Sequence, residues 1–229
     1  MSKTIVVVGY GPGISTAVAE KFGAEGFSVS LVARNPESLA EGVAALRAKG
    51  VAAAGFQGDA ADPVSISAAI GKARDAFGPI TVLHWNAISG SQAGDLLAID
   101  PTRVGGTFDV AIVGLLSAVH EVLPDLKNTR EGAVLVTNGA FGFIIPPMDA
   151  LAVSLQSMGV ALANAAKAKL VGLLSERLKA DGVYVGEVTV AGAVKGTPYA
   201  MEGGIEGAKI ADMFWTLYCA RDEIRATVS

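Results

Sequence analysis

The sequence has few charged residues, a single cysteine and no tyrosine between Tyr10 and Tyr184. Charged residues make up 17% of the 229 residues and the net charge is −4, so nothing in the composition indicates a nucleic acid partner. The single Cys219 excludes an internal disulfide and fits a reducing cytoplasm. Hydrophobic residues, in contrast, make up 51% of the chain. This composition suits a parallel sheet covered by helices on both faces, and it also indicates a large subunit interface.

The sequence also lacks a long, strongly apolar run. Residues 5–8 are too few for a signal peptide and lead directly into a glycine-rich loop. Residues 150–166 carry no charge, but a membrane-spanning helix needs about 20 strongly apolar residues. The residues that weaken this stretch are Ser154, Gln156, Ser157, Gly159 and Asn164. We therefore expect a buried or interfacial helix here, no membrane partner and a cytoplasmic protein.

Strand-like and helix-like patterns alternate from the first residues to the last. The runs that we interpret as strands cover residues 4–8, 27–33, 51–56, 80–84, 133–137, 183–190 and 224–228. The helical stretches cover residues 14–25, 36–49, 63–77, 101–126 and 206–220, and a long apolar helix ends near residue 181. Asn35 and Asp62 each precede a proline, as an N-cap does, and Gly182 is placed as a C-cap.

This alternation predicts the fold class. Strands that alternate with helices favour right-handed crossovers within one parallel sheet. No internal repeat or linker divides the chain. We therefore expect an α/β protein with a single doubly wound Rossmann-type domain over residues 1–229, in which helices cover both faces of a parallel seven-stranded sheet.

A glycine-rich turn follows the first predicted strand and contains Gly9, Gly11, Gly13 and Ile14. A tight turn without side chains lets backbone N–H groups approach a pyrophosphate, and the next helix directs its positive end at the phosphates. Its position between a strand and an amphipathic helix favours a dinucleotide site over a simple tight turn.

The motifs resemble those of the short-chain dehydrogenase/reductase family. The spacing Gly9-xxx-Gly13-Ile14 resembles TGxxxGIG, with Val8 in place of Thr and Ser15 in place of the last Gly. Residues 58–62 resemble xDVxD, and residues 85–88 resemble NNAG without its first Asn and final Gly. The matches stand in order over most of the chain.

The resemblance implies roles for the residues of these motifs. Asp59 is expected to accept a hydrogen bond from the adenine amino group, with Ala60 beside the ring. Asn86 is expected to brace the centre of the sheet, and the loop with Ala87 to line the adenosine and ribose. At the end of the second strand the chain has Arg34 where NAD-preferring folds place an acid. A guanidinium suits a 2′-phosphate, so NADP(H) is favoured over NAD(H).

The residues that carry the family's proton transfer are missing. The family uses Asn, Ser, Tyr and Lys, with the Tyr as proton donor. Residues 109–114 resemble DVNLTG with Ala111 at the Asn, and residues 132–139 resemble GxIVNISS with Gly139 at the Ser. The YxxxK motif has three alternative alignments: Val160 with Asn164, Ala163 with Lys167, or Ala152 with Gln156. None of the three supplies a tyrosine.

Three residues are weak candidates for a substitute catalytic group: Asn138, Lys167 and Tyr199. Asn138 could hydrogen-bond a carbonyl but supplies no proton, and a desolvated Lys167 could act as an acid or else bind ribose. Tyr199 follows a segment that resembles the family's substrate loop near Thr197, although an anchoring aromatic is the simpler interpretation. His84 and His120 are interpreted as core or surface residues, and no metal-ligand cluster is present.

Apolar residues follow the fifth predicted strand at positions 141–148. Together with Trp85 and Ile88 they predict either an apolar pocket near the nicotinamide, for a small apolar substrate or ligand, or a contact surface. In the family, the helices after the fourth and fifth strands pair across a dimer axis. The small-residue helix in this chain fits such packing, so we expect a homodimer or homotetramer.

The sequence thus favours an NADP(H)-dependent oxidoreductase with a non-standard active site. The alternative is a catalytically inactive NADP(H)-binding sensor or scaffold protein, because a fold does not guarantee its common activity. Ordinary ketone or alcohol chemistry by the usual four residues ranks lowest.

Overall fold

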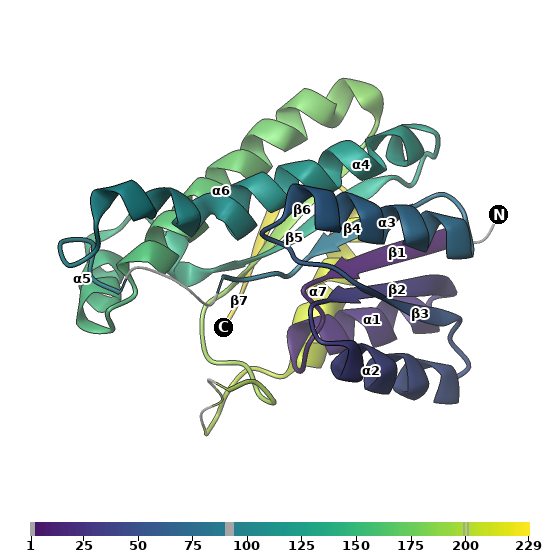
Figure 1. Cartoon of the computed structure of the whole chain (residues 1–229), viewed down its shortest axis with the longest axis horizontal. Coiled ribbons are helices and arrows are strands. Elements are labelled where there is room, and N and C mark those ends of the chain that lie inside the picture. Colours follow the sequence, from purple (N-terminus) through teal and green to yellow (C-terminus); the bar gives the residue numbers. More distant parts are fainter. Residues whose placement is uncertain (1–2, 90–93, 199, 201) are drawn as a thin grey trace.

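A seven-stranded sheet forms the centre of the protein (Figure 1). The structure is a computed structural model that describes residues 3–89, 94–198, 200 and 202–229. The strands are β1 (Lys3–Val8), β2 (Phe27–Ala33), β3 (Ala53–Gln57), β4 (Val82–Trp85), β5 (Ala133–Gly139), β6 (Tyr184–Val190) and β7 (Arg225–Val228). Their order is β3-β2-β1-β4-β5-β6-β7, and every neighbouring pair is parallel. The predicted parallel sheet of seven strands is confirmed.

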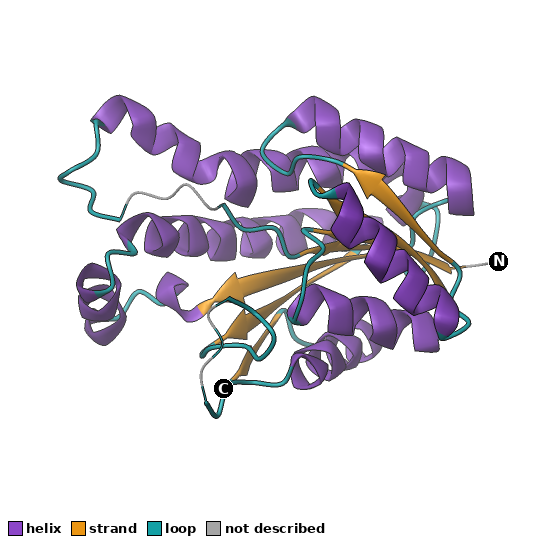
Figure 2. Cartoon of the chain, turned by 60° about the horizontal axis from the view of Figure 1, so that its bottom comes forward, coloured by secondary structure: helices purple, strands orange, loops and turns teal. Residues whose placement is uncertain are grey.

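Helices cover both faces of this sheet (Figure 2). They are α1 (Ile14–Ala24), α2 (Pro36–Ala48), α3 (Pro63–Phe77), α4 (Leu115–Lys127), α5 (Pro146–Ser154), α6 (Met158–Leu178) and α7 (Gly207–Ala220). One apolar core joins α1, α2 and α7 to the sheet, and a second joins α3, α4 and α6 to its other face. The doubly wound α/β fold class is therefore confirmed.

The predicted helix caps form the expected contacts. The side chain of Asn35 accepts a hydrogen bond from the amide of Glu37, and that of Asp62 accepts one from Val64. Gly182 adopts a left-handed conformation at the end of the short 3₁₀ helix η4 (Lys179–Asp181) that follows α6. The polar and proline signals in the sequence therefore located these ends correctly.

The predicted helix over residues 101–126 is helical throughout, but only its second half is α-helical. The chain there forms a 3₁₀ stretch, η1 (Pro101–Phe108), a π-helical turn, η2 (Asp109–Gly114), and only then α4. Gly105 and Gly106 lie in the first stretch, and glycine is a poor residue for an α-helix. The π-turn brings Val110 to the mouth of a cleft that is described below.

The long apolar helix that ends near residue 181 is preceded by a separate short helix. A 3₁₀ turn, η3 (Ala140–Gly142), follows β5, and α5 then ends before α6 begins. Gln156 lies between these two helices with a φ of 47°, a left-handed conformation that interrupts helical hydrogen bonding. Residues 150–166 are therefore divided between two helices.

Two helical stretches, Pro101–Lys127 and Met158–Asp181, are long and apolar enough to cross a membrane by length and composition alone. In the structure α4 and α6 instead pack against the sheet beside α3 and contribute to its second apolar core. This is the place of the covering helices in a soluble Rossmann-type fold.

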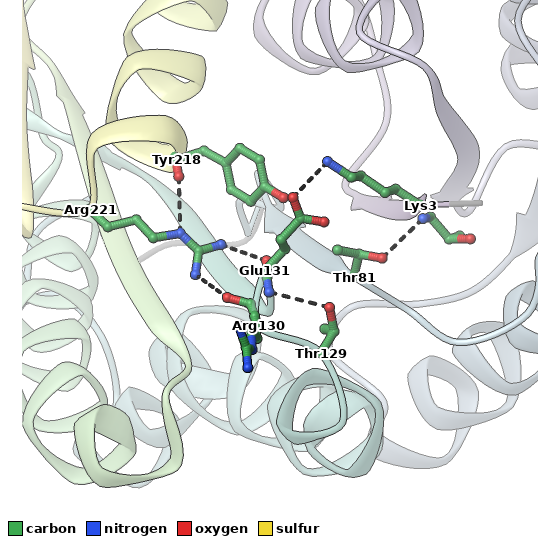
Figure 3. A network of polar contacts seen from close by, with 8 residues as sticks. Lys3, Thr81, Thr129, Arg130, Glu131, Tyr218 and Arg221 are labelled. Carbon is green, nitrogen blue, oxygen red and sulfur yellow. Dashed lines mark hydrogen bonds and ion pairs between the residues drawn. The ribbon is translucent and has the colours of Figure 1, made fainter. Parts of the chain in front are cut away.

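A polar network closes the amino-terminal edge of the sheet, opposite the carboxyl ends of the strands (Figure 3). The guanidinium of Arg221, just after α7, donates to the carbonyl oxygens of Tyr218, Arg130 and Glu131 at 3.1, 3.0 and 2.6 Å. The Glu131 carboxylate accepts a hydrogen bond from Lys3 Nζ at 2.7 Å. These contacts join the ends of α7, β5 and β1.

We expect Arg221→Ala to lower the free energy of unfolding by about 1–3 kcal/mol, because three carbonyl groups lose a charged donor. Urea unfolding measures this change. Arg130→Ala is the matched control, because only the carbonyl group of Arg130 takes part in this network. Equal stability of the two variants would show that the network contributes nothing.

Candidate functional site

A large cleft lies along the carboxyl ends of the strands and encloses about 810 Å³. It extends from the ends of β2 and β3, past the turn after β1, to the ends of β5 and β6. The strand order reverses between β1 and β4, and an open parallel sheet binds ligands in the crevice at such a reversal. Three groups of residues line the cleft, and each is described in turn.

The glycine turn after β1 packs directly against the end of β4. Gly9 has a φ of 82°, and a Cβ atom at this position would lie 2.5 Å from the Cα atom of Ala87. Only glycine fits such an approach. Gly9, Gly11 and Ile14 line the cleft, and Gly13 is the residue that precedes α1. The turn therefore presents backbone groups and the amino end of α1 to a ligand.

Ser15 stabilises this turn from within. Its hydroxyl donates to the carbonyl oxygen of Gly11 at 2.8 Å and accepts from the amide of Gly11 at 2.9 Å. Thr16 also donates to the Gly11 carbonyl, at 2.8 Å. The serine that replaces the family's last glycine thus uses its proton inside the turn.

Arg34 and Asp59 lie at the β2–β3 end of the cleft. Arg34 is exposed, and its guanidinium makes no ion pair with any residue that the structure describes. A carboxylate oxygen of Asp59 accepts a hydrogen bond from the amide of Ala61 at 3.0 Å, and Ala60 lies beside it in the cleft wall. Among the described residues, this end therefore offers an unpaired cation and a carboxylate acceptor to a ligand.

Asn86 connects the glycine turn to β4. Its Nδ2 atom donates to the carbonyl oxygen of Gly9 at 3.4 Å, and its amide donates to Val8 at 2.9 Å. Its Oδ1 atom is buried and has no partner in the described chain. An unpaired buried acceptor in the cleft wall suits a ligand hydroxyl. This acceptor and the close turn at Gly9 both fit a dinucleotide.

The opposite end of the cleft is formed by β5, β6 and α6. Asn138 is 4% exposed and donates from Nδ2 to the carbonyl oxygen of Asn164 at 3.0 Å and to Glu187 Oε1 at 3.3 Å. Its Oδ1 atom accepts from the amide of Gly139 at 3.0 Å. The amide group of Asn138 thus braces the wall, and both of its N–H groups are already paired.

Steric crowding explains why residue 139 is a glycine. A Cβ atom on Gly139 would lie 2.8 Å from Nδ2 of Asn164. Asn164 is only 7% exposed and lines the cleft. It therefore occupies space that a serine at position 139 would need.

Lys167 is the titratable residue at this end of the cleft among the described lining residues. It is 6% exposed, and no hydrogen bond or ion pair to another described residue involves its ammonium group. Burial lowers the pKa of Lys167 to about 8, although the charge of Glu187 acts in the opposite direction. At neutral pH it is therefore a protonated amine with an unusually low affinity for its proton.

The structure places the last residue of two of the three YxxxK alignments in the cleft wall. Lys167 and Asn164 both line the cleft, whereas Gln156 is exposed and does not. Ala163 is buried one turn before Lys167. Ala111 is buried in η2 and has no place in the cleft wall.

The other candidates lie in different surroundings. His84 is fully buried, contacts Thr137 Oγ1 at 3.1 Å and has its pKa lowered to about 3 by burial, so it is a neutral core residue. His120 is exposed on α4. Tyr199 lies outside the described residues, and its neighbour Thr197 lines the cleft. The described residues contain no cluster of potential metal ligands.

The apolar segment after β5 forms a surface and contributes nothing to the wall of the main cleft. Ile144 is 87% exposed, and Ile145 and Phe143 are partly exposed. Trp85 is fully buried in the core, and only Ile88 of the residues predicted for an apolar pocket lines the cleft. Of the two alternatives predicted for these residues, an apolar pocket near the nicotinamide or a contact surface, the exposed side chains agree better with the contact surface, which stays a prediction.

The fold and the cleft define a dinucleotide-binding protein of the Rossmann type. The chain belongs to the short-chain dehydrogenase family: the model described as short chain dehydrogenase matches residues 3–151.

Several curated relatives of this chain are reductases. It is 27% identical over 127 residues to the peroxisomal 2,4-dienoyl-CoA reductase of Arabidopsis thaliana, a match that covers 56% of this chain and 42% of that protein. It is 24% identical over 191 residues to the 3-oxoacyl-[acyl-carrier-protein] reductase of Staphylococcus aureus, with 82% and 77% covered. The match to the plant enzyme thus spans less than half of that enzyme's length.

Solved structures of the family have the same fold over the whole chain. A metagenomic short-chain oxidoreductase in complex with NADP has a TM-score of 0.80 at 22% identity, with 99% of this chain and 95% of that chain covered. An NADPH-bound short chain oxidoreductase from Pseudomonas aeruginosa PAO1 with an atypical catalytic center has a TM-score of 0.84 at 18% identity, with the same coverage.

Sequence reasoning missed Glu187, and it named Asn164 only as one alternative position for the lysine of the YxxxK motif. Glu187 is 1% exposed on β6 beneath the Lys167 end of the cleft. A lone Glu among Val, Gly and Thr in a predicted strand that is apolar on both faces was the available signal.

We expect Gly9→Ala to abolish dinucleotide binding and to destabilise the fold, because its Cβ would collide with the backbone of Ala87 in a left-handed conformation. Thermal unfolding and fluorescence titration with NADPH measure the two effects. Gly71→Ala in α3 is the control, since a Cβ there meets nothing within 4 Å. Unchanged NADPH affinity in Gly9→Ala would contradict this account of the turn.

We expect Lys167→Met to raise the free energy of unfolding at pH 7 by about 1–3 kcal/mol. The pKa of Lys167 is about 8 in the folded protein and 10.5 in the unfolded chain, so the unfolded chain binds the proton more tightly. The resulting destabilisation of the wild type is complete below pH 8 and disappears as the pH rises to 10.5. Urea unfolding at several pH values measures it, and a wild type more stable than the variant at pH 7 would refute it.

Proposed function

We propose that this protein binds NADP(H) in the cleft and acts as an oxidoreductase with a non-standard active site. One contrast carries the proposal. The turn and adenosine end keep the groups that suit a dinucleotide, whereas the family's Asn and Ser positions are Ala111 and Gly139. In the alignment of Lys167, the tyrosine position is Ala163.

The preference for NADP(H) over NAD(H) rests on Arg34. The guanidinium is exposed at the edge of the cleft without a protein partner, and it can pair two oxygens of a 2′-phosphate. Asp59 and Ala60 are proposed to hold the adenine, and Asn86 and Ala87 the adjoining ribose.

The proposed reaction is the reduction of an activated double bond or carbonyl group. A reduced nicotinamide in the cleft would supply a hydride, and the protein would position the reactants. The relatives named above include a dienoyl-CoA reductase and an oxoacyl reductase, so both bond types are represented among similar proteins. The exposed Ile88 in the cleft wall favours a small apolar substrate.

The second candidate function is NADP(H) binding without turnover, as in a sensor or scaffold protein. The absence of the family's Asn, Ser and Tyr side chains at Ala111, Gly139 and Ala163 favours it.

We also propose a homodimer or homotetramer formed through α4 and α6. Leu162 and Leu173 on α6 and Val113 on η2 are exposed apolar side chains on this covering layer. Light scattering after gel filtration measures the mass in solution, and a monomer would contradict the proposal.

Turnover distinguishes the two candidate functions. NADPH is mixed with a panel of enones, ketones and quinones, and its absorbance is followed together with binding by fluorescence. Consumption of NADPH with a reduced product supports the oxidoreductase, and binding without turnover supports the sensor. Failure to bind either nicotinamide cofactor would refute both.

We expect Arg34→Ala to weaken NADPH binding by about 10- to 100-fold and to leave NADH binding nearly unchanged, because a charge-assisted hydrogen bond contributes about 1.5–3 kcal/mol. Fluorescence titration measures both dissociation constants. Arg103→Ala is the control, since Arg103 is exposed on η1 and outside the cleft wall. Equal weakening of both cofactors would contradict the role of Arg34.

A further inference from the structure

A buried polar layer lies between α6 and the sheet, behind the Lys167 end of the cleft. Glu187 on β6 is 1% exposed, and its Oε1 atom accepts hydrogen bonds from Asn138 Nδ2 at 3.3 Å and Thr189 Oγ1 at 3.0 Å. Its Oε2 atom is buried without a hydrogen-bond partner in the described chain. A buried carboxylate with one unpaired oxygen is costly and calls for an explanation.

A second, small cavity of about 110 Å³ borders this carboxylate. Glu187, Thr189, Arg225 and Thr227 contribute to its wall, and Asn138 belongs to both this cavity and the main cleft. Its volume exceeds what one water molecule requires, and these polar side chains border it. The cavity therefore has room for a water molecule beside the Glu187 carboxylate, separate from the main cleft.

The negative charge of Glu187 raises the pKa of Lys167 and so opposes the effect of burial. Arg225 on β7 is the other charged residue of the layer: its Nε atom is 4.0 Å from Glu187 Oε2, and it also donates to the carbonyl oxygen of Ala168 at 2.6 Å. Of the other elements packed on α6, η1 carries Arg103 and η2 carries Asp109, and both are exposed.

The remaining charged elements near α6 lie farther along its surface. On α5 the charged residue is Asp149, which is exposed, and η3 and β5 carry no charged residue. In η4, Asp181 pairs with Lys127 at 2.8 Å. The buried charge that faces the Lys167 region is therefore that of Glu187.

Lys167 is also the one group that can exchange a proton at this end of the cleft, within the residues that the structure describes. The other titratable lining residues are Tyr10, Arg34 and Asp59, which lie at the glycine turn and at the β2–β3 end. The hydroxyl of Thr197 donates to the carbonyl oxygen of Val194 at 2.8 Å.

We infer that Lys167 is the proton donor of the reaction in this cleft, and that Glu187 is a positioning residue that keeps Lys167 protonated from behind. The inference rests on the proposed function, because it assigns the proton that accompanies hydride transfer. A lysine that only binds ribose keeps its proton, whereas a proton donor changes its protonation state in every cycle.

The proton balance is simple. The substrate receives a hydride at one atom of its double bond, and the other atom becomes basic. An N–H bond of Lys167 breaks, and its proton forms the new bond at that atom. Neutral Lys167 then takes up one proton from water, so each cycle consumes one proton and one hydride. No oxidant or metal is needed.

The first test measures the protonation of Lys167 without any cofactor. The protein is labelled with 13C-lysine, the Cε signal of Lys167 is identified by its loss in Lys167→Met, and its shift is followed against pH. We expect a pKa near 8, lowered by about one unit in Glu187→Gln, because the amide keeps the hydrogen bonds but removes the charge. Glu176→Gln, an exposed change on the same helix, is expected to leave the titration unchanged.

The second test follows reduction in the NADPH-dependent assay. Lys167→Arg keeps the positive charge but holds its proton, so we expect NADPH affinity near that of the wild type and a kcat lowered by about 100-fold or more. In the wild type, kcat for reduction is expected to fall as the pH rises above 8. In Glu187→Gln this fall begins at lower pH, and in Glu176→Gln it does not move.

The outcomes separate this inference from the proposed function. An unchanged Lys167 titration in Glu187→Gln, or a wild-type kcat in Lys167→Arg, would overturn the inference while NADP(H) binding and turnover stand. A wild type that binds NADPH without turnover would remove both the reaction and its proton donor, leaving the sensor.

Discussion

The reversal of strand order between β1 and β4 is the constraint on which the rest of the structure depends. Crossovers on either side of this point cover opposite faces, so the carboxyl ends of β1 and β4 meet without a helix above them. The chain leaves β1 through Gly9, which packs against Ala87 at the end of β4 with no space for a side chain. Asn86 then joins the two ends by a hydrogen bond to Gly9. These contacts form the floor of the cleft, and the space above the carboxyl ends of β1 and β4 stays open to a ligand.

The two ends of the cleft differ in chemistry. At the adenosine end, Arg34 and Asp59 are solvated groups whose charges are available to a ligand. At the opposite end the polar groups are buried, and most are paired with one another through Asn138. Lys167 is the exception, since burial reduces its affinity for a proton without giving it a partner. A desolvated amine of this kind costs stability and gains reactivity, which is the usual compromise at functional sites.

The correspondence between sequence and structure was closest where the physical causes are local. Apolar runs located all seven strands, and the side chains of Asn35 and Asp62 capped the helices that they were predicted to begin. The differences came from long-range packing. Residues 101–126 are helical but begin with 3₁₀ and π-helical turns, and residues 141–148 lie outside the wall of the main cleft. A hydrophobic pattern indicates that one face of a segment is buried, but it does not identify the element that packs against that face.

By itself, the sequence determined the family, the parallel sheet and the loss of the tyrosine at every possible alignment of its motif, because these depend on residue type and order alone. Only the tertiary structure decided that Asn164 occupies the space beside Gly139 and that Lys167 lies buried in the cleft with Glu187 behind it. The reason is that β5, β6 and α6 are separated along the chain and meet only after the sheet is assembled. The energy of a charge depends on its surroundings, so the chemistry of this site was settled by folding.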